Sequence, residues 1–243
     1  MILKFKKKTL SLIGKTWRFN DEVALKFDTH VKQSIPHYSS FQKYIARLSE
    51  WFLKDNCLVY DLACSTGETI NQLLNLKIST KFSVIGVDNS KKMLELAKRK
   101  INKKIKRKKI EVKLILKDLN EIKLKKSNLV LAILVFMFFN YKQRLILLKK
   151  IYKSLDSGGA FISVEKIRSS NSHYEDILNQ MYFDFKLSQN LSEKEILNKA
   201  KSLRSSMYLF NEKITKNLLK EAGFKDSEVF FKCFNFIGYV AIK

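Results

Sequence analysis

Short apolar runs alternate with helical patterns through the middle of the chain. An apolar run at 58–62 precedes a helical pattern at 68–76, and a second run at 82–88 precedes a helix that Ser90 caps. Two further runs follow, at 112–117 and at 129–136, and the last is apolar on both faces. Strand-length runs alternating with helices predict parallel strands with helical crossovers, and continuous apolarity predicts a buried strand.

The flanking regions complete the pattern. A helix is expected to begin at the Asn20 cap, with Val23, Phe27 and Val31 on one face, and to end before Pro36. The other expected elements are a helix at 40–53, a helix at 144–155, a turn at 156–159, a strand at 160–164, helices within 170–210 with a capping box from Ser192 to Glu195, a helix at 215–222 stopped by Gly223, and a hairpin of 228–233 with 236–242.

This order predicts an α/β fold with a doubly wound, mostly parallel, seven-stranded sheet and a terminal hairpin, the arrangement of class I S-adenosylmethionine-dependent methyltransferases. No stretch has linker composition, so one domain is expected. Its expected parts are a helical lid (1–54), a nucleoside-binding core (55–168), a helical insert (169–212), and the last helix with the hairpin (213–243).

Composition narrows the class of protein. The chain has 243 residues, 46% of them hydrophobic, which suits one domain with a large core. No run approaches the roughly 18 apolar residues of a membrane span, and the lysine-rich start lacks the apolar region of a secretory signal. Three scattered cysteines exclude a disulfide scaffold and a zinc framework. We therefore expect a cytoplasmic protein without a metal.

The net charge of +24 raises the question of nucleic acid. Lysines are spread over the whole chain, and only 98–109 forms a dense basic block. A solvated lysine-rich surface is the favoured interpretation, and direct contact with tRNA stays open.

The candidate ligand site lies where the predicted strands end. The first strand ends in a turn of small residues that contains Ala63, Cys64, Ser65 and Gly67. The second strand ends at Asp88, where such folds bind ribose hydroxyls, and the third ends at Asp118. Since the carboxyl ends of parallel strands meet at one crevice, the sequence predicts a nucleoside site. Cys64 is interpreted as a small apolar residue of the turn rather than as a nucleophile.

From about residue 17 to 243, the chain resembles the carboxy-S-adenosyl-L-methionine synthases of bacterial tRNA wobble-uridine modification. The resemblance rests on the segments 19–24 (FNDEVA), 34–39 (SIPHYS), 59–65 (VYDLACS), 88–90 (DNS), 165–166 (EK), 183–186 (FDFK) and 233–236 (CFNF). The last two of these are unusual outside that family.

The resemblance implies an enzyme that converts S-adenosyl-L-methionine and prephenate into carboxy-S-adenosyl-L-methionine and phenylpyruvate. S-adenosylmethionine would be a substrate, CO2 from prephenate would be captured away from water beneath a closed lid, and the enzyme would be a homodimer. The family pattern places the nucleoside ligand at Tyr38, Ala63, Cys64, Ser65, Asp88, Asn89, Asp118 and Leu119.

The chain departs from the family pattern at three ligand positions. Ala63 replaces a glycine, Ile133 replaces an asparagine, and Ala200 replaces the arginine that holds the new carboxylate. If 192–206 is helical, Arg204 lies one turn after Ala200 on the same face, and Lys201 is rotated by about 100°. Arg204 and Lys201 are therefore candidate carboxylate partners, and surface positions are the alternative.

Two other functions stay open from the sequence. An ordinary S-adenosylmethionine-dependent methyltransferase would transfer its methyl group to an added acceptor without prephenate. A nucleoside-binding or RNA-associated protein that has lost catalysis would bind tRNA with a steep salt dependence.

Overall fold

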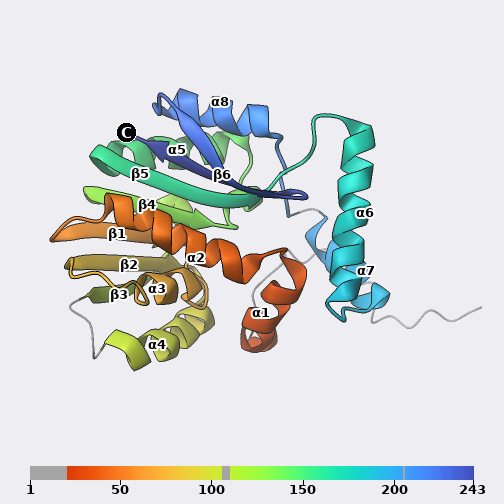
Figure 1. Cartoon of the computed structure of the whole chain (residues 1–243), viewed down its shortest axis with the longest axis horizontal. Coiled ribbons are helices and arrows are strands. Elements are labelled where there is room, and N and C mark those ends of the chain that lie inside the picture. Colours follow the sequence, from red (N-terminus) through yellow and green to blue (C-terminus); the bar gives the residue numbers. More distant parts are fainter. Residues whose placement is uncertain (1–20, 106–109, 205) are drawn as a thin grey trace, which may run out of the picture.

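The computed structural model describes residues 21–105, 110–204 and 206–243, with side chains from Phe27 onward except that of Lys103. Its centre is a sheet of seven strands in the order β3-β2-β1-β4-β5-β7-β6 (Figure 1). The strands are β1 (Cys57–Leu62), β2 (Phe82–Asp88), β3 (Glu111–Leu116), β4 (Ser127–Ile133), β5 (Leu155–Lys166), β6 (Ser227–Cys233) and β7 (Phe236–Ile242).

The first five strands are parallel, and β7 pairs antiparallel with both β5 and β6. The strand order reverses between β1 and β4, which are neighbours in the sheet. In open α/β sheets a ligand binds outside the carboxyl ends of the strands at such a reversal. The predicted seven-stranded sheet with its terminal hairpin is confirmed.

Helices cover both faces of the sheet. They are α1 (Asp21–Ser34), α2 (Tyr38–Ser49), η2 (Glu50–Phe52), α3 (Glu68–Leu73), α4 (Lys91–Ile105), η3 (Leu119–Glu121), η4 (Phe136–Phe138), α5 (Tyr141–Ser154), α6 (Ser172–Ser188), α7 (Glu193–Leu203) and α8 (Glu212–Ala222). None of the described helices combines the length and hydropathy that a membrane-spanning segment requires.

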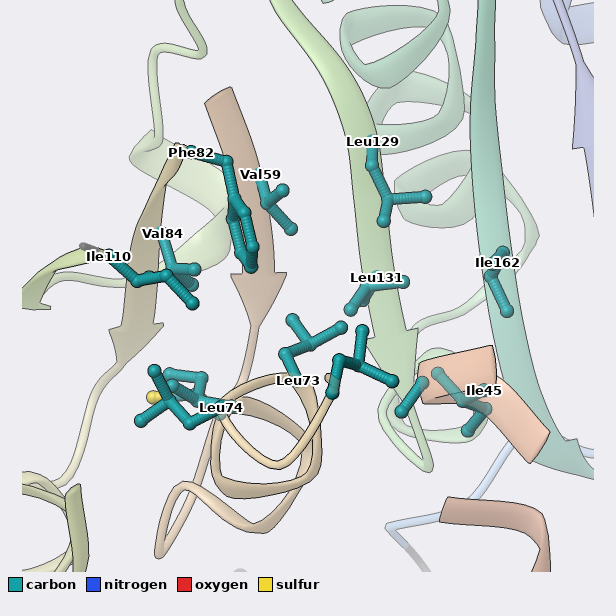
Figure 2. Close-up of a cluster of buried hydrophobic side chains, with 14 of the residues drawn as sticks. Ile45, Val59, Leu73, Leu74, Phe82, Val84, Ile110, Leu129, Leu131 and Ile162 are labelled. Atoms are coloured by element: carbon teal, nitrogen blue, oxygen red, sulfur yellow. The ribbon is translucent and has the colours of Figure 1, made fainter. Parts of the chain in front are cut away.

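Strand alternation divides the core into two layers. Side chains such as Val59, Leu129 and Leu131 face Ile45 of α2 and Leu73 of α3 (Figure 2). The intervening residues of the same strands pack in a second cluster with α5 and α8. The central strands are therefore apolar on both faces, as the continuous apolar run at 129–136 predicts.

Helices α1, α6 and α7 lie together at the end of the sheet where β5 leads into α6 (Figure 1). Gln33 of α1 donates a hydrogen bond of 3.1 Å from its side-chain amide to the carbonyl of Gln189, just after α6. The helical lid and the helical insert thus meet beside the carboxyl ends of the strands.

Several predicted boundaries need correction. β4 ends at Ile133 rather than 136, because Leu134 takes a left-handed φ of 59° and a 3-10 turn follows. α5 begins at Tyr141 rather than 144, since Asn140 and Gln143 form a capping box. α3 ends at Leu73, three residues early, and β5 extends over 155–166 and includes the predicted turn at 156–159. The Asn20 cap lies outside the described residues.

Candidate functional site

The turn after β1 is the most strained part of the site. Ala63 and Ser65 have positive φ values of 57° and 51°, and Gly67 has 75°. A left-handed conformation costs about 1–2 kcal/mol for a residue with a side chain, and such strain is concentrated at functional sites. A Cβ atom on Gly67 would lie 3.0 Å from the Cβ atom of Ala97 in α4. Glycine therefore permits the close approach of this turn to α4.

Asp88, at the end of β2, holds this turn in place. Its carboxylate accepts hydrogen bonds of 2.9 Å from the backbone N–H of Ser65 and from that of Ser90. Burial raises the pKa of Asp88, and the backbone N–H donors act in the opposite direction. A carboxylate has about four acceptor positions, so the backbone donors leave room for a ribose hydroxyl and the predicted role of Asp88 is compatible with its bonds.

Asp61 is a site residue that the sequence reasoning did not assign. It lies in β1 and is 1% exposed, and its Oδ2 atom has no hydrogen-bond partner among the described residues. Burial, reinforced by the charge of Asp88, raises the pKa of Asp61 to about 8. A buried carboxyl group without a partner is costly, so Asp61 is ready to take up a cationic or hydrogen-bonding ligand group.

The side chain of Asp118, after β3, lies on the surface, where it accepts hydrogen bonds from the backbone N–H and side-chain amide of Asn120. Leu119 is buried, and Asn89 is exposed. The backbone N–H of Lys117 donates to the carbonyl of Asp88, which brings the ends of β2 and β3 together. The three predicted strand ends therefore converge on one edge, with Asp118 at its outer side.

The lid is fastened to the turn by a polar network. Asp28 of α1 accepts a hydrogen bond of 2.5 Å from the Thr66 hydroxyl and pairs with the Lys100 ammonium at 2.7 Å. Lys100 also pairs with Glu68 at 3.1 Å. Part of the basic block at 98–109 thus has a structural role, while residues 106–109 lie outside the described structure.

Tyr38 begins α2 on the inner side of the lid and is buried. Burial and the nearby carboxylates, chiefly Glu68, raise the pKa of its hydroxyl, and a hydrogen bond with Gln42 acts in the opposite direction. The neutral phenol is therefore the form present at this place, where it lies between the lid and the strand ends.

The positions at which this chain lacks a ligand contact of the family pattern have different surroundings. Ile133 ends β4, is partly buried, and pairs in register with Val164. Ala200, Lys201 and Arg204 are all exposed on α7 or at its C-cap. The helical face that carries Ala200 and Arg204 therefore faces solvent in the described chain, and their role as carboxylate partners stays a prediction.

Cys64 is buried in the turn, and its backbone N–H donates to the carbonyl of Val87. Burial, together with the carboxylates of Asp61 and Asp88, raises the pKa of the thiol well above its usual value. A neutral thiol is a poor nucleophile, which agrees with the interpretation of Cys64 as a packing residue. Within the described residues, no cluster of three metal-binding side chains occurs.

A sheet of this order, with a strained turn after β1 and a buried carboxylate at the end of β2, invites comparison with known proteins. Residues 20–242 match the ubiE/COQ5 methyltransferase family. The chain belongs to this family. This is a family of S-adenosylmethionine-binding methyltransferases, and the acidic strand ends, with an Asp61 oxygen that has no partner among the described residues, are compatible with such a ligand.

Among its relatives, the chain is 33% identical to the carboxy-S-adenosyl-L-methionine synthase of Staphylococcus epidermidis over 228 residues, which cover 93% of this chain and 97% of the relative. It is 34% identical to the synthase of the same name from Yersinia pestis, over 93% and 84% of the two chains. A putative S-adenosylmethionine-dependent methyltransferase structure from Methanococcus maripaludis superposes with a TM-score of 0.62 at 17% identity, covering 94% and 95%. That likeness confirms the class I methyltransferase fold.

Proposed function

We propose that this family member converts S-adenosyl-L-methionine and prephenate into carboxy-S-adenosyl-L-methionine and phenylpyruvate, and so supplies the carboxymethyl donor for tRNA wobble-uridine modification. The observation that carries the proposal is the 33% identity to a carboxy-S-adenosyl-L-methionine synthase over nearly the whole length of both chains.

The reaction balances without a further reactant. Prephenate loses CO2 and its ring hydroxide and becomes phenylpyruvate. The CO2 forms a carbon–carbon bond with the methyl carbon of S-adenosylmethionine, and the proton that this carbon gives up leaves with the hydroxide as water. The protein must hold two substrates together and exclude solvent while CO2 is free.

The residues of the crevice suit the first substrate. The unpaired carboxyl of Asp61 is placed to bind the cationic methionyl end, and Asp88 presents carboxylate lone pairs to the ribose. The strained turn at 63–67 follows Asp61 in the chain, and Asp88 binds it through the backbone N–H of Ser65. α1, bound to the turn through Asp28, acts as the lid that excludes water.

A homodimer is part of the proposal. Five large apolar side chains are exposed along α6, and they are Tyr174, Ile177, Met181, Phe183 and Leu187. Exposed apolar side chains gathered on one helix mark an interaction surface. Light scattering during size-exclusion chromatography tests this: a dimer is expected for the wild type, and a shift toward monomer for Met181→Glu.

The first experiment identifies the small molecule that freshly purified protein carries. Mass spectrometry of the supernatant after denaturation is expected to detect carboxy-S-adenosyl-L-methionine. In a second measurement, prephenate and S-adenosylmethionine are added to protein from which the bound small molecule has been removed. Phenylpyruvate and carboxy-S-adenosyl-L-methionine are expected to form in equal amounts.

If these two measurements do not detect carboxy-S-adenosyl-L-methionine, one of the other two functions applies. Methyl transfer to an acceptor without any need for prephenate would establish an ordinary methyltransferase. Plain S-adenosylmethionine in the supernatant, no turnover and salt-dependent tRNA binding would indicate a binding protein.

A further inference from the structure

Near the end of β5, two lysine ammonium groups lie against one buried aromatic ring, that of Tyr182 in α6. Lys166 is the last residue of β5, and Lys186 lies in the last turn of α6. Their Nζ atoms are 4.5 and 4.1 Å from the centre of the Tyr182 ring, and the Lys186 Nζ atom is also 4.4 Å from the centre of the Phe183 ring. Lys186 is only 8% exposed.

Neither ammonium is within ion-pair distance of a carboxylate among the described residues. Burial, and then the charge of Lys166, lowers the pKa of Lys186 to about 8. Burial also lowers the pKa of Lys166, which Glu175 opposes from a longer distance. Aromatic rings attract cations, but the cost of removing a charge from water is fully met only by an anion.

The place of the two lysines in the fold joins them to the crevice. Side chains alternate along β5, so that Glu165 faces Arg144 of α5 while Val164 and Lys166 lie on the opposite face. Val164 pairs in register with Ile133, the last residue of β4. Lys166 therefore lies at the carboxyl edge, one strand away from the switch point.

The lid reaches both ends of this edge. Asp28 of α1 is bound to the turn after β1. The pKa of His30, two residues later, is lowered mainly by burial. The charges of Lys199 and Lys186 lower it further, and that of Glu195 opposes them, so His30 lies near these side chains. One helix thus extends from the acidic, nucleoside end of the crevice to a basic end at β5 and α6.

We propose that Lys166 and Lys186 form a carboxylate-binding subsite at the basic end of the crevice. The identity of the carboxylate rests on the proposed function: it is either the new carboxymethyl group of the product or a carboxylate of prephenate. The subsite supplies the cation that Ala200 does not, from a buried position, whereas Arg204 and Lys201 are exposed.

The test measures ligand affinities by titration calorimetry on the full-length protein. The ligands are S-adenosylmethionine, carboxy-S-adenosyl-L-methionine, and prephenate added to protein saturated with S-adenosylhomocysteine. The variants are Lys186→Met, Lys166→Met, Lys186→Arg and Arg204→Ala. Lys142→Met, at an exposed position of α5, is the matched control for loss of one lysine charge.

A charge-assisted hydrogen bond corresponds to about a 10- to 100-fold change in affinity. We expect Lys186→Met to weaken the binding of either carboxy-S-adenosyl-L-methionine or prephenate by this factor. The affinity for S-adenosylmethionine should change by less than about twofold, since the proposed subsite does not take the methionyl carboxylate. Loss for carboxy-S-adenosyl-L-methionine identifies the product carboxylate, and loss for prephenate identifies the second substrate. Lys166→Met should act in the same direction, and Lys186→Arg and Lys142→Met should keep the affinity.

Unchanged affinity for both carboxylate ligands in Lys186→Met and Lys166→Met would overturn the subsite, as would a loss confined to Arg204→Ala. If Lys186→Met does not fold, Lys166→Met and Lys186→Arg decide by the same criteria. The same measurements distinguish a failure of the subsite from a failure of the proposed function. If the wild type has no turnover but its affinity for a carboxylate ligand depends on Lys186, the subsite is supported and the synthase function is refuted. If turnover occurs and is unchanged in both lysine variants, the synthase function is supported and the subsite is refuted.

Discussion

Two adjacent residues at the end of β5, the buried Glu165 and the half-buried Lys166, carry charges with opposite surroundings. Glu165 is 2% exposed and accepts a hydrogen bond of 2.6 Å from Arg144, which is itself 1% exposed. Lys166, on the other face of the strand, has an aromatic ring and a second lysine as neighbours. One side of the strand holds a completed ion pair, and the other holds two cations that pair with no carboxylate in the described part of the chain.

The difference separates charges that stabilise the fold from charges kept for a ligand. Arg144 also donates to the carbonyls of Phe139 and Tyr208 and lies 4.5 Å from the Phe210 ring, so its donors are used within the protein. Asp61 at the other end of the crevice resembles the lysines, since a buried oxygen has no partner. Among the described residues, polar groups without a partner thus lie at the crevice, and the Arg144–Glu165 pair lies behind it.

The largest effect is expected from breaking the completed pair. Arg144→Met leaves Glu165 buried without its cation, which typically costs about 3–5 kcal/mol of unfolding free energy. Urea denaturation measures this loss. Replacing both partners, Arg144→Met with Glu165→Leu, should recover part of it, and an equal loss in the double variant would show that the pair itself is not the cause.

Asp61→Asn tests the buried carboxyl at the acidic end, which would give up its proton to pair with a cationic ligand group. The variant should bind S-adenosylmethionine about 10- to 100-fold more weakly, because a charged contact is lost. In the ligand-free wild type the folded carboxyl keeps its proton from its ordinary pKa of 3.8 up to about 8. The folded state then binds more protons than the unfolded one, so stability should fall as pH rises through this window, and Asp61→Asn should lack that fall.

Calorimetric affinities and melting temperatures between pH 4 and 9 check both parts. Asp226→Asn, the same substitution at an exposed position just before β6, is a control that should change neither. A normal affinity together with an unchanged pH profile in Asp61→Asn would remove Asp61 from the site.

Lys186 should show the opposite pH dependence. Its folded pKa of about 8 lies below its ordinary value of 10.5, so between these pH values the unfolded state binds more protons and wild-type stability rises with pH. Lys186→Met should lack the rise. At pH 7 it should equal the wild type or exceed it by about 1–3 kcal/mol, since a desolvated cation is removed. Chemical denaturation at pH 7 and pH 10 checks this, and destabilisation at pH 7 would show that Lys186 supports the fold instead.

The comparison also shows what a sequence can predict. Apolar periodicity was sufficient for the seven strands along the chain and for the terminal hairpin, and the Ser192–Glu195 capping box is confirmed. Asp61 was not assigned because it stands inside an apolar run, where its missing partner becomes visible only in three dimensions. Lys166 and Lys186 are twenty positions apart, and only the packing of Tyr182 brings them together. The early end of β4 depends on the left-handed Leu134, which no local pattern announces.

The smallest effect is expected at a third kind of charge, the partly exposed pair of Asp28 and Lys100 that fastens the lid. The side chains are 44% and 21% exposed, so water already solvates them, and Asp28→Asn should cost no more than about 1 kcal/mol of unfolding free energy. Asp28 nevertheless joins α1 to the turn after β1, which belongs to the proposed ligand site. We therefore expect faster dissociation of S-adenosylmethionine, by about two- to fivefold for a contribution of that size.

Stopped-flow measurement of ligand release checks this, with Lys92→Met as the control, since Lys92 and Glu95 form a weaker surface pair at 3.9 Å on α4. Equal release rates in all three proteins would mean that the lid stays closed without its polar fastening. Faster release with unchanged stability would show that Asp28 and Lys100 combine both properties. They form an ion pair, as Arg144 and Glu165 do, and they affect ligand binding, as is proposed for Asp61 and the two lysines.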